Sequence, residues 1–186
     1  MNARIRDTNA EHAYYTLQAS GPRGRELADI LARRHTRVVV TRRVTGGLTL
    51  NFLNTIFLQP LRAEANDAEY KGWVCLLAHE ACHIEQKFWI DSIQQEMRAY
   101  ASQARVAQEL GIDLGVIQRV FGNLNPDRAA DQNIARAELS RLFGQTPAGI
   151  VYASLPLGQP VGLYALVPAL RQITALVRAA FYRPMA

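Results

Sequence analysis

The chain has 186 residues, of which 49% are hydrophobic and 20% are charged. These values are typical of roughly one globular domain and exclude a disordered chain. Two cysteines are too few for a disulfide scaffold, so a hydrophobic core must supply the stability.

The formal net charge of +5 is concentrated in the first quarter of the sequence. Residues 1–45 hold nine arginines and four acidic residues, whereas the rest of the chain holds twelve basic and twelve acidic side chains. A basic segment of this kind is typical of an arm that binds nucleic acid or a membrane, or of a solvated surface biased toward arginine. We expect the solvated surface and rank nucleic acid as an unlikely partner.

The N-terminal stretch MNARIRDTNAEHAYY lacks the apolar run of a secretory signal. Cys75 and Cys82 are seven residues apart, which on a continuous helix is about 10 Å of rise and too far for a disulfide. We therefore expect a cytoplasmic protein with two reduced thiols.

Residues 148–170 are almost uncharged and long enough to cross a bilayer. Pro156, Pro160 and Pro168 interrupt any helix there, so a spanning helix is not favoured, although it is not excluded. We expect a buried segment or a surface covered by another copy of the chain, which makes a homo-oligomer an open alternative.

Periodicity and capping residues predict the elements in chain order. They are a helix over 22–34, a strand over 37–44, one or two strands over 48–58, a helix from about Asp67 to Trp89, a helix from Asp91-Ser92 to about Leu110 with Gly111 as its stop, a short helix between Asp113 and Gly122, a helix from Asn125-Pro126 to Gly144, and an amphipathic helix over 161–181. The Gly46-Gly47 pair between two β-prone runs predicts a hairpin turn.

A few strands followed by many helices predict an α+β fold. We expect a small mixed sheet packed on one long helix and a helix hairpin, followed by a mainly helical C-terminal part. The chain is predicted to be a single domain with three parts. These are a basic N-terminal segment (1–45), a central part with the sheet and the site helices (46–110), and a helical extension (111–186).

The central motif is His79-Glu80-Ala81-Cys82-His83, which contains H-E-x-x-H. Histidines four residues apart share one helix face, with Cβ atoms about 5–6 Å apart, so both imidazoles can reach one zinc ion. Glu80, next to the first histidine, can then act as general base on a water at the metal. A chance match to this pattern is the first alternative.

A helical wheel gives a second test of the motif. At 100° per residue, His79 and His83 lie opposite an apolar stripe that includes Leu77, Ala81 and Ile84. Histidines that only fill the core would lie within this stripe. The remaining alternative is a pair of solvent-facing histidines without function.

A third ligand follows from the predicted helix hairpin. With the turn centred between residues 89 and 90, His83 faces Glu96 and His79 faces Tyr100. Glu96 is therefore the expected third ligand. Asp91 is the rival, although its expected capping role uses the same carboxylate.

The segments HEACHIEQ and EMRAYASQ resemble the gluzincin branch of the zincin metallopeptidases, especially its small single-domain members. The resemblance covers about residues 48–110. It implies zinc held by His79, His83 and Glu96, and Glu80 as the base that activates water and passes the proton to the leaving amine. It also implies that an edge strand within Leu48–Leu58 pairs with an extended peptide substrate.

Two further roles remain open. Tyr100 is a candidate for stabilising the developing oxyanion, with an aromatic packing role as its alternative. Cys82 lies 60° from His79 on the wheel, where a small buried residue is the expected role.

We therefore expect a zinc-dependent peptidase that cleaves peptide or protein substrates. One alternative is an inactive protein of zincin fold that binds or regulates a partner through its basic N-terminal or apolar C-terminal surface. Another is a structural metal site without turnover. A further hypothesis is self-inhibition, in which the apolar segment 148–170 covers the cleft.

Overall fold

The structure is a computed structural model, and it describes residues 3–87, 91–144, 146–158, 168 and 174. It divides into two compact units. The first comprises Met1–Trp89 and Arg98–Gly122, and the second comprises Ile90–Met97 and Asn123–Ala186. The single-domain organisation stays a prediction, and each unit is described by itself.

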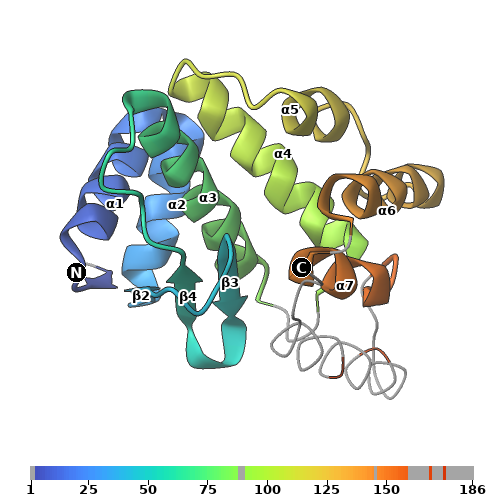
Figure 1. Ribbon diagram of the computed structural model, residues 1–186, viewed down its shortest axis with the longest axis horizontal. Helices are drawn as coiled ribbons and strands as arrows, with labels where there is room; N and C mark the ends of the chain where they lie inside the picture. Colours follow the sequence, from blue (N-terminus) through green and yellow to red (C-terminus); the bar gives the residue numbers. More distant parts are fainter. Residues whose placement is uncertain (1–2, 88–90, 145, 159–167, 169–173, 175–186) are drawn as a thin grey trace. The chain divides into compact units, whose positions relative to one another are not determined.

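The first unit contains a sheet and the helices around it (Figure 1). Its elements are β1 (Arg4–Ile5), α1 (Thr8–Ser20), α2 (Pro22–Arg33), β2 (Arg37–Val40), β3 (Gly47–Leu50), a 3-10 turn (Asn51–Leu53), β4 (Thr55–Leu58), α3 (Asp67–Gln86), all but the first residues of α4 (Ile93–Glu109), and α5 (Val116–Phe121). The second unit contains the start of α4, α6 (Ala129–Phe143) and α7 (Pro147–Ser154).

The sheet has four strands in the order β1-β2-β4-β3. β2 lies parallel to β1 and β4, and β3 lies antiparallel to β4 at the edge, so the sheet is mixed as expected. Helices α1, α2 and α3 pack together, and a shared core includes Leu17, Leu31, Ile56 and Leu77. The α+β prediction, with packed α3 and α4 and a helical C-terminal part, is confirmed.

The predicted hairpin at Gly46-Gly47 is wrong. β4 lies between β2 and β3, and the tight connection joins β3 to β4 instead. The apolar strands β2 and β4 contribute Val38 and Ile56 to the core and therefore occupy the centre of the sheet. Gly46 has a φ of +81° and is hydrogen-bonded to Gln59, so its loop is fixed to the end of β4.

Capping residues set the ends of α3. Asn66 and Glu69 form a reciprocal capping box at the start of the helix, with bonds of 2.9 and 3.0 Å. Lys87 adopts a φ of +61°, which ends the helix at Gln86, before the predicted Trp89. The expected start of α4 is confirmed for Ser92, whose Oγ accepts the N–H of Gln95 at 3.3 Å.

Most other predicted helices are confirmed, whereas β1, α1 and α7 were not predicted. The helices expected over 22–34, near 113–122 and ending at Gly144 correspond to α2, α5 and α6. Helix α1 was not predicted, although Asp7 caps it by accepting the N–H of Ala10 at 3.0 Å. The helix expected over 161–181 lies outside the described residues, apart from two isolated positions.

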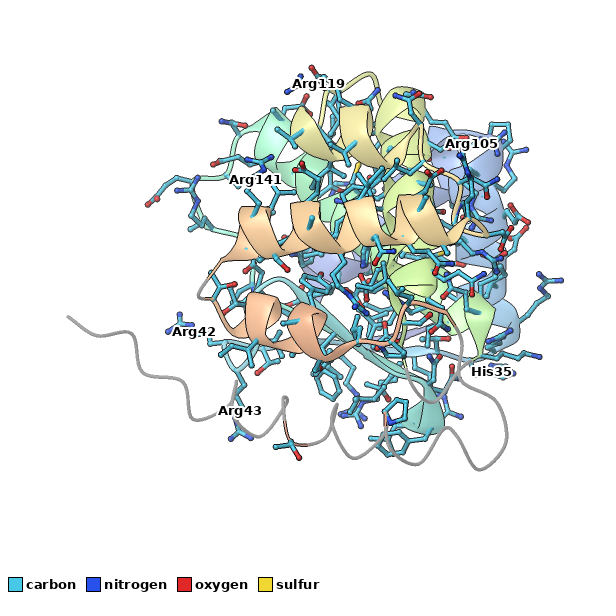
Figure 2. The ribbon with its side chains drawn as sticks, turned by 90° about the vertical axis from the view of Figure 1, so that its right-hand side faces the viewer. His35, Arg42, Arg43, Arg105, Arg119 and Arg141 are labelled. Atoms are coloured by element: carbon cyan, nitrogen blue, oxygen red, sulfur yellow. The ribbon has the colours of Figure 1, made fainter. Side chains whose placement is uncertain are left out.

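The basic N-terminal segment has two kinds of arginine. Seven of its nine arginines are exposed, and Arg42 and Arg43 project outward from the loop before β3 (Figure 2). The other two, Arg23 and Arg34, are half-buried and bond to α3. Within the part of the chain that the structure describes, no helix is long and apolar enough to cross a membrane. Residues 159–167, 169 and 170 of the apolar stretch 148–170 lie outside that part.

Candidate metal centre

Helix α3 brings His79 and His83 together on one face. Both side chains are only 5% exposed, and their Nε2 atoms are 3.2 Å apart. Two nitrogens that each lie roughly 2.0–2.1 Å from a tetrahedral metal ion are about 3.4 Å apart, so the pair already has the spacing of two metal ligands. Burial of both rings excludes the alternative of two solvent-facing histidines.

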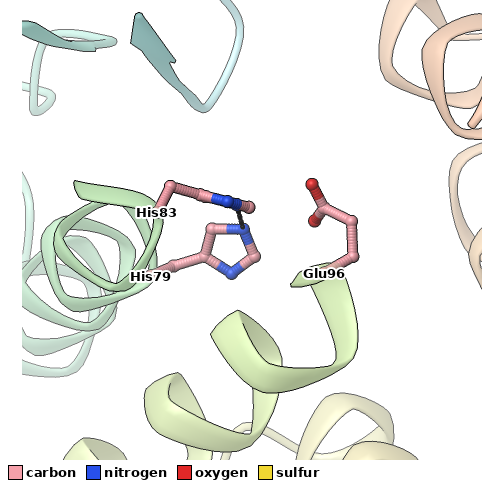
Figure 3. Close-up of side chains that lie close together, drawn as sticks. All are labelled: His79, His83 and Glu96. Atoms are coloured by element: carbon pink, nitrogen blue, oxygen red, sulfur yellow. Dashed lines mark hydrogen bonds between the residues drawn. The ribbon is translucent and has the colours of Figure 1, made fainter. Parts of the chain in front are cut away.

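Glu96 comes from the first turn of α4, the helix whose later turns belong to the first unit. Its side chain is 5% exposed, and one ligand atom from each of His79, His83 and Glu96 lies within 4.8 Å of the other two. Figure 3 shows the carboxylate turned toward the two imidazoles. The rival ligand Asp91 is not part of this group. Glu96, which the helix-hairpin arithmetic placed opposite His83, therefore lies in one group with both histidines, and its role as a metal ligand stays a prediction.

The three donors fit a transition-metal ion. Imidazole nitrogens suit zinc, copper, iron and nickel, whereas magnesium and calcium prefer sites built from oxygen. Three protein ligands also leave a coordination position for water or substrate. The group can therefore hold a metal ion whose identity the geometry does not fix.

Glu80 follows His79 and is buried at 4% exposure. The hydroxyl of Thr49, on edge strand β3, lies 2.7 Å from Glu80 Oε2 and 3.1 Å from the Glu80 backbone oxygen. Gly47, two residues earlier on the strand, lies so close that an added Cβ would be 2.4 Å from Glu80 Oε1. The carboxylate beside the histidines is therefore in contact with β3, a neighbour that sequence reasoning did not identify.

Tyr100 lies beside His79, as the hairpin arithmetic predicts, with ring centroids 4.5 Å apart. Its other neighbour is Phe121, whose ring stacks on it at 4.7 Å. These two ring contacts fit the aromatic packing role, which was the alternative for Tyr100 in the sequence analysis. A role for Tyr100 in stabilising an oxyanion stays a prediction.

The side of α3 that faces α2 carries a different group of polar residues. The Arg23 guanidinium, 14% exposed, lies 2.6 Å from Glu85 and also bonds to Glu26 and Ser102. Burial alone would lower the pKa of Arg23, but its hydrogen bonds to Glu85 and Glu26 raise that pKa above the usual range. Burial also raises the pKa of the nearby Cys82 thiol to about 11, as expected for a small buried residue.

Sequence reasoning missed the Arg23–Glu85 pair because its members are 62 positions apart. Nothing in the local sequence distinguishes Arg23 from the exposed arginines around it. A weak signal was available on α2, where Arg23 precedes Glu26 by three residues and therefore shares a face with an acid.

Comparisons with known proteins give no independent indication of function. No known protein family matches the chain, and neither a curated protein nor a solved structure matches it. The feature of the molecule that indicates a function is therefore the buried group of His79, His83 and Glu96, with Glu80 beside it.

Proposed function

We propose that the chain is a zinc-dependent peptidase of the H-E-x-x-H type, similar to the gluzincin branch of the zincins. The observation that carries this proposal is the convergence of His79, His83 and Glu96 within 4.8 Å. Two imidazoles and one carboxylate form a donor set typical of catalytic zinc in peptidases. A structural zinc site, in contrast, usually has four protein ligands.

Glu80 is the proposed general base. When bound, zinc polarises a carbonyl group and makes water easier to deprotonate. Glu80 accepts the proton of the attacking water and then delivers it to the leaving amine. Its position next to His79 on the same helix keeps its carboxylate close to the ligands, and its burial limits competition from bulk water.

Strand β3 is the proposed docking edge for the substrate. Among the described strands, β3 pairs with β4 on one side and ends the sheet on the other. An extended peptide can add to such an edge through its backbone, so the proposed substrate class is an unfolded or extended segment of protein.

The test is to load the purified chain with zinc and measure cleavage of an unfolded protein substrate, with Glu80→Gln as the matched variant. Zinc content should stay at one ion per chain in both proteins, whereas cleavage should fall by roughly 10²–10⁴-fold in the variant, the usual contribution of a general base. Glu85→Gln, a carboxylate on the same helix that faces α2, is the control and should keep its activity.

Other outcomes would assign the site differently. Stable zinc binding with no cleavage by the parent would indicate a structural or regulatory metal site. Cleavage that persists in Glu80→Gln with zinc bound would remove Glu80 from the mechanism. A chain that takes up no zinc would contradict the proposal as a whole.

A further inference from the structure

We propose that β3 positions the general base. In this proposal the hydroxyl of Thr49 holds the Glu80 carboxylate in one orientation, and glycine at position 47 leaves the space that this carboxylate occupies. Both are therefore positioning residues. The inference rests on the proposed catalytic role of Glu80. It adds a second task to β3, which is the proposed docking edge for the substrate.

The first contact is the hydrogen bond from Thr49. At 2.7 Å from Glu80 Oε2, its hydroxyl is a short, charge-assisted donor to the carboxylate. The same hydroxyl lies 3.1 Å from the Glu80 backbone oxygen, so it contacts both ends of the glutamate. Thr49 is β-branched and pairs with Ile56 in the sheet, which restricts its χ1 angle and fixes its backbone.

The second contact is the close approach of Gly47. Gly47 and Thr49 are two residues apart on one strand and therefore face the same side. A Cβ at position 47 would lie 2.4 Å from Glu80 Oε1 and 2.7 Å from Glu80 Cδ. Any larger residue would therefore displace the carboxylate. Positive φ is not the reason for this glycine, because among the described residues the glycines with positive φ are Gly46, Gly111, Gly115 and Gly144.

The two contacts restrict both oxygens of Glu80, because Oε2 lies against the Thr49 hydroxyl and Oε1 lies against the Gly47 backbone. A glutamate side chain has three rotatable bonds, and each must be fixed if the carboxylate is to meet an attacking water. A hydroxyl donor can fix the side chain without placing a full positive charge beside it. A cation in the same position would stabilise the ionised carboxylate more strongly and make it a weaker proton acceptor. Thr49 is therefore suited to orient a base.

The experiment compares four variants of the zinc-loaded chain. Thr49→Val keeps the β-branched shape and removes the hydroxyl, and it should lower kcat by roughly 10–100-fold, the usual effect of losing an outer-shell partner, with KM and zinc content unchanged. Thr49→Ser restores the hydroxyl and should recover kcat to within a few-fold. Gly47→Ala should lower kcat at least as much as Thr49→Val. Gly72→Ala is the matched control on α3, because a Cβ there meets nothing within 4 Å.

Crystal structures of the zinc-free parent and Thr49→Val proteins give a readout that does not depend on activity. We expect the Glu80 carboxylate to leave its place against β3 in the variant. If the parent cleaves substrate, an unchanged kcat in Thr49→Val, or no recovery in Thr49→Ser, would overturn the inference. If the parent cleaves nothing, the proposed function fails, and the crystal structures decide the positioning role. A displaced Glu80 supports that role, and an unmoved one overturns it.

Discussion

Two glutamates five positions apart on α3 have different surroundings. Glu85 lies on the side that faces α2, where the Arg23 guanidinium pairs with it at 2.6 Å. Glu80 lies on the side that faces β3, where the neutral hydroxyl of Thr49 donates to it at 2.7 Å. The Glu85 carboxylate pairs with a cation, and the Glu80 carboxylate accepts a hydrogen bond from a hydroxyl.

This difference separates a structural acid from a candidate base on the same helix. A salt bridge between partly buried groups holds two helices together. The cation favours the ionised carboxylate, which is therefore a poor proton acceptor. Arg34 strengthens the same attachment, because its guanidinium bonds to the backbone oxygens of Ile84 and Glu85 at the end of α3. The α2-facing side therefore fixes α3 in place, and the β3-facing side carries the proposed chemistry.

The largest expected effect is the loss of metal from the group of His79, His83 and Glu96. His83→Ala or Glu96→Ala removes one of three ligands, so zinc affinity should fall by more than the roughly 10–100-fold typical of an outer-shell change. Glu85→Gln should leave that affinity unchanged. Competition with a chromophoric chelator measures it. Equal affinities for the parent and Glu96→Ala would remove Glu96 from the ligand set.

Zinc should also stabilise the parent against unfolding. At a free zinc concentration 100 times Kd, a ligand specific for the native state adds about 2.7 kcal/mol to the free energy of unfolding. The ligand variants should lose this increment, and Glu85→Gln should keep it. Thermal unfolding with and without zinc gives the measurement.

The second effect concerns the α2-facing side. Arg23→Ala leaves the Glu85 carboxylate without its guanidinium and removes the bond to Ser102. We expect the free energy of unfolding to fall by about 1–3 kcal/mol, less than the 3–5 kcal/mol typical of a fully buried pair, because Glu85 is 31% exposed. Urea denaturation measures the change. Zinc affinity per folded molecule should not change, and a parallel loss of zinc would contradict the separation of the two sides.

The accuracy of sequence reasoning also differs between the two sides of α3. The H-E-x-x-H spacing and the symmetry of a helix hairpin are short-range patterns, and they placed Glu96 beside His83 and Tyr100 beside His79. The helical wheel identified the polar face but did not indicate that it is buried, because burial depends on elements distant in sequence.

Contacts between distant segments could not be predicted. Thr49 meets Glu80 across 31 positions, and Arg23 meets Glu85 across 62. The hairpin error has the same cause, because the parallel pairing of β2 with β4 depends on how the strands share the core and not on the Gly46-Gly47 pair. The overall α+β class was predictable because it follows from the periodicity of individual segments.

The third effect compares the two glutamates directly in the zinc-free chain. Glu85→Gln removes a charge that Arg23 compensates, so the free energy of unfolding should fall by about 1 kcal/mol. Glu80→Gln removes a buried charge, and an amide oxygen can accept the hydrogen bond that Thr49 donates to the carboxylate. We therefore expect no loss of stability, or a small gain. Urea denaturation of both variants gives the measurement, and equal losses would mean that the two carboxylates have equivalent surroundings.

The last effect concerns the Cys75 thiol of α3, whose pKa burial raises to about 12. An unfolded thiol ionises at about pH 8.5, so above that pH the unfolded chain binds fewer protons than the native chain. The free energy of unfolding should then fall as pH rises toward 12, by at most about 1.4 kcal/mol per pH unit for this thiol. Below about pH 7 the thiol is neutral in both states and contributes almost no pH dependence.

Cys75→Ala isolates this contribution. Urea denaturation between pH 8 and pH 10 should show a shallower decline for the variant than for the parent, because other groups with raised pKa values, such as Tyr14, are common to both proteins. Identical slopes would mean that water reaches Cys75 in the native state. A shallower slope would show that α3 excludes water where no polar partner is supplied. A buried carboxylate such as Glu80 would then depend on protein donors such as Thr49 in place of water.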